Sequence, residues 1–215
     1  MKKLLLTTTL LLGFASAANA TIIATFGQTE DVNTVFATDN GAFTTIVVNN
    51  SIAGINVFAG GTLSSAVFSM HASSTDNATI VGPAIIQHYS GTFCFTSLNG
   101  CAGINYLTGT FSDAAFGANG GPGLVLNVNN PPDTLVLTSS VIAASELNPP
   151  SSFNLGFTNL GPALHVDGQT IGAFTAAYAG NVSSNLATVP EPTSMALLGT
   201  AVLGIGMLAK RRKSL

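Results

Sequence analysis

Short runs of β-branched and aromatic residues, separated by turn-forming residues, dominate residues 21–188 of this chain. No long window there repeats its apolar residues with the period of a helix, because Gly, Thr, Asn and Ser interrupt every one. Such a pattern is typical of strands joined by turns. The best strand candidates are residues 42–48, 62–70, 92–96, 104–111, 124–128, 134–142, 152–157 and 169–178.

Many short strands without intervening helices predict an all-β fold, either an antiparallel β-sandwich or a jelly-roll-like domain. Because the chain has no tryptophan and three tyrosines, we expect a core of phenylalanine, valine, isoleucine and leucine. Residues 129–133, Asn-Asn-Pro-Pro-Asp, predict a hairpin that joins 124–128 to 134–138. Residues 1–20 and 189–213 each place an apolar segment beside basic residues, as export signals do. We therefore assign the part between them, 21–188, to one exported β-rich domain, a length that suits a single core.

Two tetrapeptides recur within this domain. Ser-Gly-Thr-Phe at 90–93 returns as Thr-Gly-Thr-Phe at 108–111, and Gly-Ala-Phe-Thr at 41–44 returns at 172–175. They form no regular period, so they predict neither a solenoid nor a propeller. Two interpretations stay open: strands that begin at glycine and bury one phenylalanine, or coincidence in a composition rich in Gly, Thr and Phe.

Basic residues are absent between residues 4 and 209, although the chain contains six of them. Without lysine or arginine the exported domain lacks the groups that bind nucleic acid, form Schiff bases or clamp carboxylates. Its acids either form an ordinary soluble surface or bind divalent cations together with other proteins or acidic polysaccharide. They are Glu30, Asp31, Asp39, Asp76, Asp113, Asp133, Glu146 and Asp167.

The two cysteines, Cys94 and Cys101, flank a strong turn signal, Asn99-Gly100, so they can face each other across a hairpin loop. An exported protein passes through an oxidising compartment, which favours a disulfide between them. Metal ligation and redox chemistry are the alternatives, but neither Cys-x-x-Cys spacing nor a nearby histidine pair is present. We therefore predict a structural disulfide.

Residues of catalytic types are few and scattered. His71, His88 and His165 are too far apart in sequence for a local metal site. His165 and Asp167 would share one face of a strand, yet no Gly-x-Ser-x-Gly motif supplies a nucleophile. We predict no catalytic residues, no metal and no cofactor, and hence a protein that is not an enzyme. A hydrolase with carboxylates from distant strands is the third interpretation.

Sugar binding is a separate possibility, because exposed aromatic rings beside Asn, Asp and Gln suit sugars. Tyr89 and Tyr106 lie near the cysteine loop in sequence and are the candidates. The alternative is that both are half-buried strand residues with solvated hydroxyls. The glycine-rich stretch 119–123 lacks the lysine and the following helix of a phosphate loop, so we interpret it as a plain loop.

Residues 1–20 have the organisation of a secretory signal peptide. Two lysines form a positive start, residues 4–14 form an apolar core, and Ala-Asn-Ala is a small-x-small cleavage site. We expect a signal peptidase to cut between Ala20 and Thr21. The alternative is a retained membrane helix, for which this core is short.

Residues 189–213 combine Pro-Glu-Pro, an apolar segment and a basic cluster. We expect the apolar segment, 194–209, to be a single transmembrane helix of about 24 Å, which suits a temporary hold better than a lasting anchor. Each proline disfavours helix in the residue before it, so the tripeptide should be extended at the membrane surface. The alternative, equally open from the spacing, is that the prolines only mark the start of the helix, where proline is common. The cluster acts as a stop-transfer signal and consists of Lys210, Arg211, Arg212 and Lys213.

This arrangement resembles the PEP-CTERM sorting signal of Gram-negative bacteria, through the segment and the cluster just described and the residues Val189, Pro190, Glu191 and Pro192. The resemblance implies recognition by exosortase, a membrane transpeptidase-like enzyme, and removal of the tail. It also implies export to the cell surface or surrounding matrix, often in organisms that make exopolysaccharide. The catalytic machinery belongs to exosortase, so no residue here inherits a catalytic role.

We therefore expect an exported surface or extracellular-matrix protein with a structural or adhesive role. A carbohydrate-binding module associated with exopolysaccharide is the alternative, ahead of a secreted hydrolase. The expected route runs through an inner-membrane intermediate to the cell surface or beyond. The expected partners are signal peptidase and exosortase during export, the membrane transiently, and then polysaccharide or divalent cations, but no nucleic acid.

Overall fold

The computed structural model describes residues 21–58, 61–62, 65–82, 84–119, 124–127, 133–149 and 151–184. These residues form strands and connecting turns with one short 3₁₀ turn, η1 (Ala144–Glu146), so the all-β prediction is confirmed. The strands are β1 (Thr21–Gln28), β2 (Val35–Asp39), β3 (Thr44–Val57), β4 (Gly61–Thr62), β5 (Ala66–Ser74), β6 (Thr79–Val81), β7 (Ala84–Leu98), β8 (Ala102–Asn119), β9 (Leu124–Asn127), β10 (Thr134–Thr138), β11 (Ser152–Gly161), β12 (Val166–Asp167), β13 (Thr170–Ile171) and β14 (Phe174–Ser184).

The predicted signal peptide, residues 1–20, lies outside the described residues, and so does the predicted helix 194–209. Within the ranges that are described, no helix has the length and hydrophobicity needed to cross a membrane.

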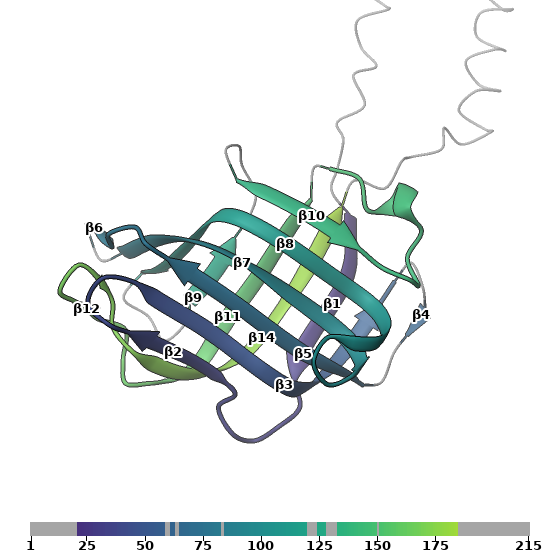
Figure 1. Ribbon diagram of the computed structural model, residues 1–215, viewed down its shortest axis with the longest axis horizontal. Helices are drawn as coiled ribbons and strands as arrows, with labels where there is room; N and C mark the ends of the chain where they lie inside the picture. The colour runs from purple at the N-terminus through teal and green to yellow at the C-terminus, as the bar shows by residue number, and fades with distance from the viewer. Residues whose placement is uncertain are drawn as a thin grey trace, which may run out of the picture.

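Twelve strands form one antiparallel sheet, whose path runs β10-β8-β9-β11-β14-β1-β3-β5-β7-β6. β7 also pairs with β8 along most of its length, so the path returns on itself. β2 pairs with both β14 and β3, beyond the end of β1. Figure 1 shows two layers: β3, β5, β7 and β8 lie in front, and β9, β11, β14 and β1 cross behind them. This arrangement is consistent with the predicted antiparallel sandwich.

The front strands are longer than the sequence predicted. β3, β7 and β8 contain 14, 15 and 18 residues. In β3 the pairing with β5 shifts between Val48 and Ser51, and Asn50 there has a φ of 50°. Two consecutive asparagines look like a turn in the sequence, but here they form a bulge, which bends the strand without ending it. The prediction also missed β1 and β2, whose apolar alternation is short.

The predicted hairpin between residues 124–128 and 134–138 is wrong. β9 pairs with residues 115–117 of β8 and with β11, whereas β10 pairs with residues 108–112 of β8. Both strands run antiparallel to β8 and follow one another along it, so they cannot face each other. β8 is long enough to offer each a separate set of backbone groups, and this long-range pairing prevails over the local turn signal.

Phenylalanine rings fill the space between the layers, as the composition predicted. In one cluster Phe93 and Phe153 stack with their ring centroids 4.1 Å apart. Full burial of such a ring contributes roughly 1.5–3 kcal/mol. This cluster contains Phe26, Phe68, Phe93, Phe95, Phe111, Phe153 and Tyr178. The second cluster contains Tyr89, Phe116, Phe157 and Phe174.

Buried Gln87 ties the β12–β13 hairpin and a neighbouring loop to the front layer. Its side-chain carbonyl accepts a hydrogen bond from the Ile171 N–H at 2.8 Å, and its amide donates to the Asp76 carbonyl at 2.8 Å. Thr44 Oγ1 donates to the Ile171 carbonyl at 2.7 Å. Since a buried amide is costly to leave unpaired, these bonds fix the loop that carries Asp76.

Candidate functional site

The outward side of the front layer carries rows of serine and threonine. Buried and exposed residues alternate along β2, β3 and β5, so every second side chain points away from the core. The strand register places these outward side chains opposite one another. We name this surface the hydroxyl face, and its hydroxyl groups belong to Thr38, Thr45, Ser69, Ser73, Ser90, Thr92, Thr108, Thr110, Ser112, Thr134 and Thr138.

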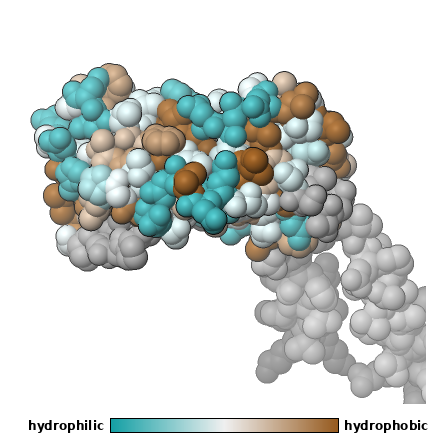
Figure 2. Space-filling model, turned by 90° about the horizontal axis from the view of Figure 1, so that it is seen from below, coloured by the Kyte–Doolittle hydropathy of each residue, from teal (hydrophilic) through white to brown (hydrophobic). Residues whose placement is uncertain are grey.

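The face is organised in rows that run across the strands. Its central row crosses six strands, from hydrophobic ends to a polar middle. Because neighbouring strands are about 4.8 Å apart, this row is about 24 Å long. It consists of Phe36, Val47, His71, Thr92, Thr110 and Val136. Figure 2 views the molecule from below, at right angles to this face, and shows hydrophilic and hydrophobic residues interspersed on that side.

The central hydroxyls face solvent. Thr92 and Thr110 are exposed, and among the described residues none forms a hydrogen bond with their side chains. Towards β10 the hydroxyls bond to one another, as in the pair of Ser112 and Thr134, whose oxygens are 2.6 Å apart. The middle of the face is therefore the part that offers unpaired donors and acceptors to a partner.

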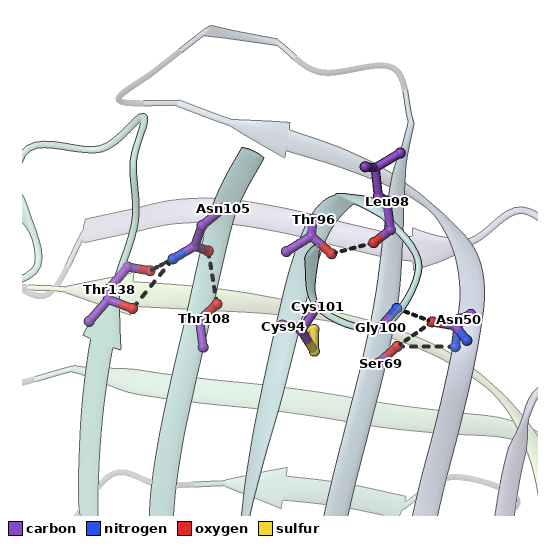
Figure 3. Close-up of a disulfide and its surroundings, with 10 residues drawn as sticks. All are labelled: Asn50, Ser69, Cys94, Thr96, Leu98, Gly100, Cys101, Asn105, Thr108 and Thr138. Carbon is purple, nitrogen blue, oxygen red and sulfur yellow. Dashed lines mark hydrogen bonds between the residues drawn. A yellow bond between two sulfur atoms is a disulfide. The ribbon is translucent and has the colours of Figure 1, made fainter. Parts of the chain in front are cut away.

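The loop between β7 and β8 covers one end of the hydroxyl face (Figure 3). Cys94 lies opposite Thr108 on the outward side, yet it is only 1% exposed. Its disulfide to Cys101, with Cα atoms 5.8 Å apart, holds the loop down. Asn50 in the β3 bulge adds a second tie, because its Oδ1 accepts a hydrogen bond from the Gly100 N–H at 2.8 Å.

A polar hollow of about 280 Å³ lies at the other end of the face, and we name it the Asp113 pocket. In it the His88 Nδ1 is 3.0 Å from Asp113 Oδ1 and 3.2 Å from the Asp113 carbonyl oxygen. Both side chains are roughly two-fifths exposed, at 44% and 38%. The lining is Ser73, Ser74, Thr75, Asp76, His88, Ser90, Ser112 and Asp113.

A bulge brings these groups together. The β7–β8 register shifts between Tyr89 and Gly91, so Ser112 and Asp113 together face Ser90. Asp113 has a φ of 60°, in the left-handed region that aspartate tolerates better than most residues. Bulges re-aim side chains, and this one directs Asp113 towards the histidine on the neighbouring strand.

The pair considered for catalysis from the sequence, His165 and Asp167, is exposed on and beside β12 and is not an ion pair. Among the described residues the one such pair is His88 with Asp113. His165 Nδ1 lies 3.1 Å from the Ala163 carbonyl instead. No group of three or more His, Cys, Asp or Glu residues that could hold a metal ion occurs in the described part of the chain.

Tyr89 does not fit the sugar-binding hypothesis, because it is 1% exposed and its hydroxyl donates to Gln87 Oε1 at 3.1 Å. Tyr106 packs half-buried against the core. Among the acids, Glu30 has a structural role, since its carboxylate accepts hydrogen bonds from Ser51 Oγ at 2.7 Å and from the Ile52 N–H at 3.1 Å.

Sequence reasoning missed both the hydroxyl face and the Asp113 pocket. The face had a signal, because Ser and Thr occupy every second position at 108–112 and flank His71 at 69–73. The pocket had no local signal, since His88 and Asp113 meet only through the β7–β8 register and its bulge.

Of the processing residues, Thr21 is the first residue of β1. Ala20 and the two C-terminal groups, 189–192 and 210–213, lie outside the described residues. The structure also leaves residues 120–123 of the glycine-rich loop undescribed.

A family model for the PEP-CTERM protein-sorting motif matches residues 188–213. No curated protein and no solved structure matches the chain. The matched motif indicates exosortase-type sorting of an exported or surface protein. It covers only the end of the chain, so the role of the β-rich domain must be argued from the domain's own surface.

Proposed function

From the sorting motif at its C-terminus, we propose that this chain is an exported adhesive protein without enzymatic activity, and that its hydroxyl face binds a neutral polysaccharide. The observation that carries the proposal is the face itself: rows of serine and threonine hydroxyls across the front layer, with His71 in the central row. After sorting, the domain meets the polymers outside the cell.

The chemistry of the face selects its partner. All six basic residues of the chain lie at positions 2, 3 and 210–213, so the domain attracts no polyanion through lysine or arginine. Hydroxyls serve as both donors and acceptors, which suits a ligand that also carries many hydroxyls. The threonine methyl groups and Val47 supply apolar contact for the C–H faces of sugar rings.

The length of the face favours a polymer over a small ligand. A single hydrogen bond contributes only about 0.5–1.5 kcal/mol net, so several must act together. A row of about 24 Å lets successive units of one extended chain contact the face at once. Adhesion of this kind needs no reacting group, which agrees with our expectation of a protein that is not an enzyme.

The test is retention of the full chain on an immobilised neutral glucan such as dextran, in a sugar-free detergent. We expect binding that persists in 1 M NaCl, because no ion pairs support it. Thr92→Val with Thr110→Val keeps the shape of both side chains but removes two central hydroxyls, and it should weaken binding about tenfold. The matched control, Thr25→Val with Thr158→Val on the back layer, should bind like the unmodified chain.

Two results would contradict the proposal. One is absence of binding to every neutral polysaccharide tried, with binding only to an acidic polymer such as alginate in the presence of Ca²⁺. The other is equal binding by the front-layer and back-layer variants. Turnover of a glycan that is lost on a single carboxylate substitution would instead favour a hydrolase.

A further inference from the structure

The Asp113 pocket offers hydrogen-bond acceptors without basic donors, and this determines what it can hold. His88 Nδ1 lies within reach of two acceptors, the carboxylate and the carbonyl of Asp113. Nδ1 therefore carries the proton that it donates to Asp113, and in the neutral ring Nε2 is an acceptor. The second carboxylate oxygen of Asp113 is a further acceptor.

The rest of the lining reinforces this polarity. Ser73, Ser90 and Ser112 belong to the hydroxyl face and adapt as donors or acceptors. Asp76 brings a second carboxylate, on the loop that Gln87 fixes through the Asp76 carbonyl at 2.8 Å. With two carboxylates and no lysine or arginine, the pocket repels phosphate, sulfate and carboxylate groups.

The complement of such a pocket is an uncharged group with several O–H donors. Adjacent hydroxyls on one sugar ring supply two donors at a fixed separation, which a carboxylate and an imidazole nitrogen can accept together. The pocket is continuous with the row that contains Ser73 and Ser90, so a sugar held there can belong to a polymer on the hydroxyl face.

We infer that the Asp113 pocket binds two neighbouring hydroxyls of one sugar unit, with Asp113 and His88 as their acceptors, and thereby selects which sugar the protein retains. This inference rests on the proposed function and adds selectivity to it. The long rows of the face provide affinity for any neutral glycan, while the pocket discriminates between sugars by the arrangement of their hydroxyls. A site that pairs specific hydroxyls favours the sugars that carry them, because a ligand without them would cover the Asp113 and His88 acceptors and leave them unpaired.

The test uses the full chain in a sugar-free detergent and titrates it with the methyl glycosides of glucose, galactose and mannose. The readouts are the NMR signals of the His88 ring and the displacement of the protein from immobilised dextran. At least one glycoside should shift the His88 signals, and the three should differ in their displacement of the protein. Asp113→Asn should lower the affinity for that glycoside at least tenfold, since an acceptor oxygen becomes an N–H₂ donor.

Asparagine tolerates the left-handed backbone at position 113, so Asp113→Asn should keep the fold. Asp167→Asn removes the same charge on β12 and should leave binding unchanged. The inference is overturned if Asp113→Asn binds and ranks the glycosides like the unmodified chain, or if Ca²⁺ without sugar causes the His88 shifts. Retention on dextran with no response of His88 to any glycoside would contradict sugar binding in the Asp113 pocket and leave the proposed function standing. Glycoside binding in the pocket without retention on any polysaccharide would support the pocket and contradict the proposed function.

Discussion

At the scale of single residues, glycine and phenylalanine form pairs across strands. Phe93 lies opposite Gly109, and Phe26 lies opposite Gly180. In each pair the ring occupies the space that a Cβ on the glycine would need. The recurring Gly-Thr-Phe tripeptides at 91–93 and 109–111 are thus neighbours on β7 and β8, with each glycine opposite the other's phenylalanine. The opposite ring leaves no room for a side chain at Gly109 and Gly180, whereas at Gly91 a Cβ would meet the His71 carbonyl and Ala72 of β5.

Substitution of Gly109 by alanine should destabilise the fold by about 1–3 kcal/mol, because the new methyl group would overlap the buried ring of Phe93. Gly27→Ala is the matched control: its Cβ would lie 3.6 Å from that of Ala179, an ordinary contact. Urea unfolding of both variants measures the difference. Equal midpoints would show that the ring has other room to move.

Buried tyrosines make the stability of the domain fall at high pH. Burial raises the pKa of Tyr178 well above its usual value; its hydrogen bond to Ser51 lowers the pKa, and the nearby charge of Glu30 raises it. The unfolded chain therefore releases the proton first, so this stability is fully present below about pH 10 and falls as the pH rises further. The loss is about 1.4 kcal/mol per pH unit for each such tyrosine.

Denaturant unfolding at several pH values from 8 to 12 checks this. Tyr178→Phe should make the decline shallower, because phenylalanine has no proton to lose. Tyr89 has a pKa raised by burial too, so the decline should persist in part. An unchanged slope in Tyr178→Phe would contradict the assignment.

At the scale of elements, bulges allow a few long strands to pair with several other strands each. β8 pairs with β7, β9 and β10, and Asp113, its non-glycine residue with a positive φ, lies between the parts that pair with β9 and β10. The β7–β8 turn is closed by the disulfide and tied to β3 by Asn50. Strand length, bulge and turn together shape both ends of the hydroxyl face.

Removal of the disulfide by Cys94→Ala with Cys101→Ala should lower the free energy of unfolding by about 2–3 kcal/mol, the chain-entropy estimate for so small a loop. Treatment of the unmodified protein with a reductant should have the same effect. Thermal unfolding with and without reductant is the measurement. A variant that still responds to reductant, or one as stable as the unmodified protein, would contradict this role.

The sequence predicts local features better than long-range ones. The strand-rich pattern and the Asn99-Gly100 turn are encoded within a few residues, which is why the fold class and the β7–β8 hairpin could be expected. The β9–β10 error has the opposite cause, since β8 competes for both strands from a distance. The Asp113 pocket depends on register and a bulge, and neither can be read from single residues.

At the scale of the whole molecule, the basic residues and the hydroxyl face lie in different parts of the chain. The six basic residues are confined to the segments on either side of the β-rich domain, while the domain itself carries the hydroxyl face. The C-terminal motif at 188–213 indicates export, and we propose that the front layer of the sandwich binds outside the cell.

The intact mass of the surface product tests the expected export and processing of the chain. We expect a polypeptide that begins at Thr21 and lacks the basic residues from Lys210 to Lys213, because signal peptidase and exosortase would each remove a terminus. Disruption of the exosortase gene in the producing cells should leave the basic tail in place. Full-length chain accumulating in the cytosol of normal cells would contradict this route.

Hydroxyl-radical footprinting of the protein with and without bound neutral polysaccharide tests most directly whether the hydroxyl face is the adhesive surface. Phe36 and Val136 are exposed at the two ends of the central row, at 48% and 64%, and His71 lies between them, so all three should lose reactivity in the complex. Phe58 and Ile22, exposed but outside the hydroxyl face, should keep theirs. Protection of Phe58 and Ile22, with Phe36, His71 and Val136 still fully reactive, would place the bound polymer elsewhere and contradict the proposed adhesive surface.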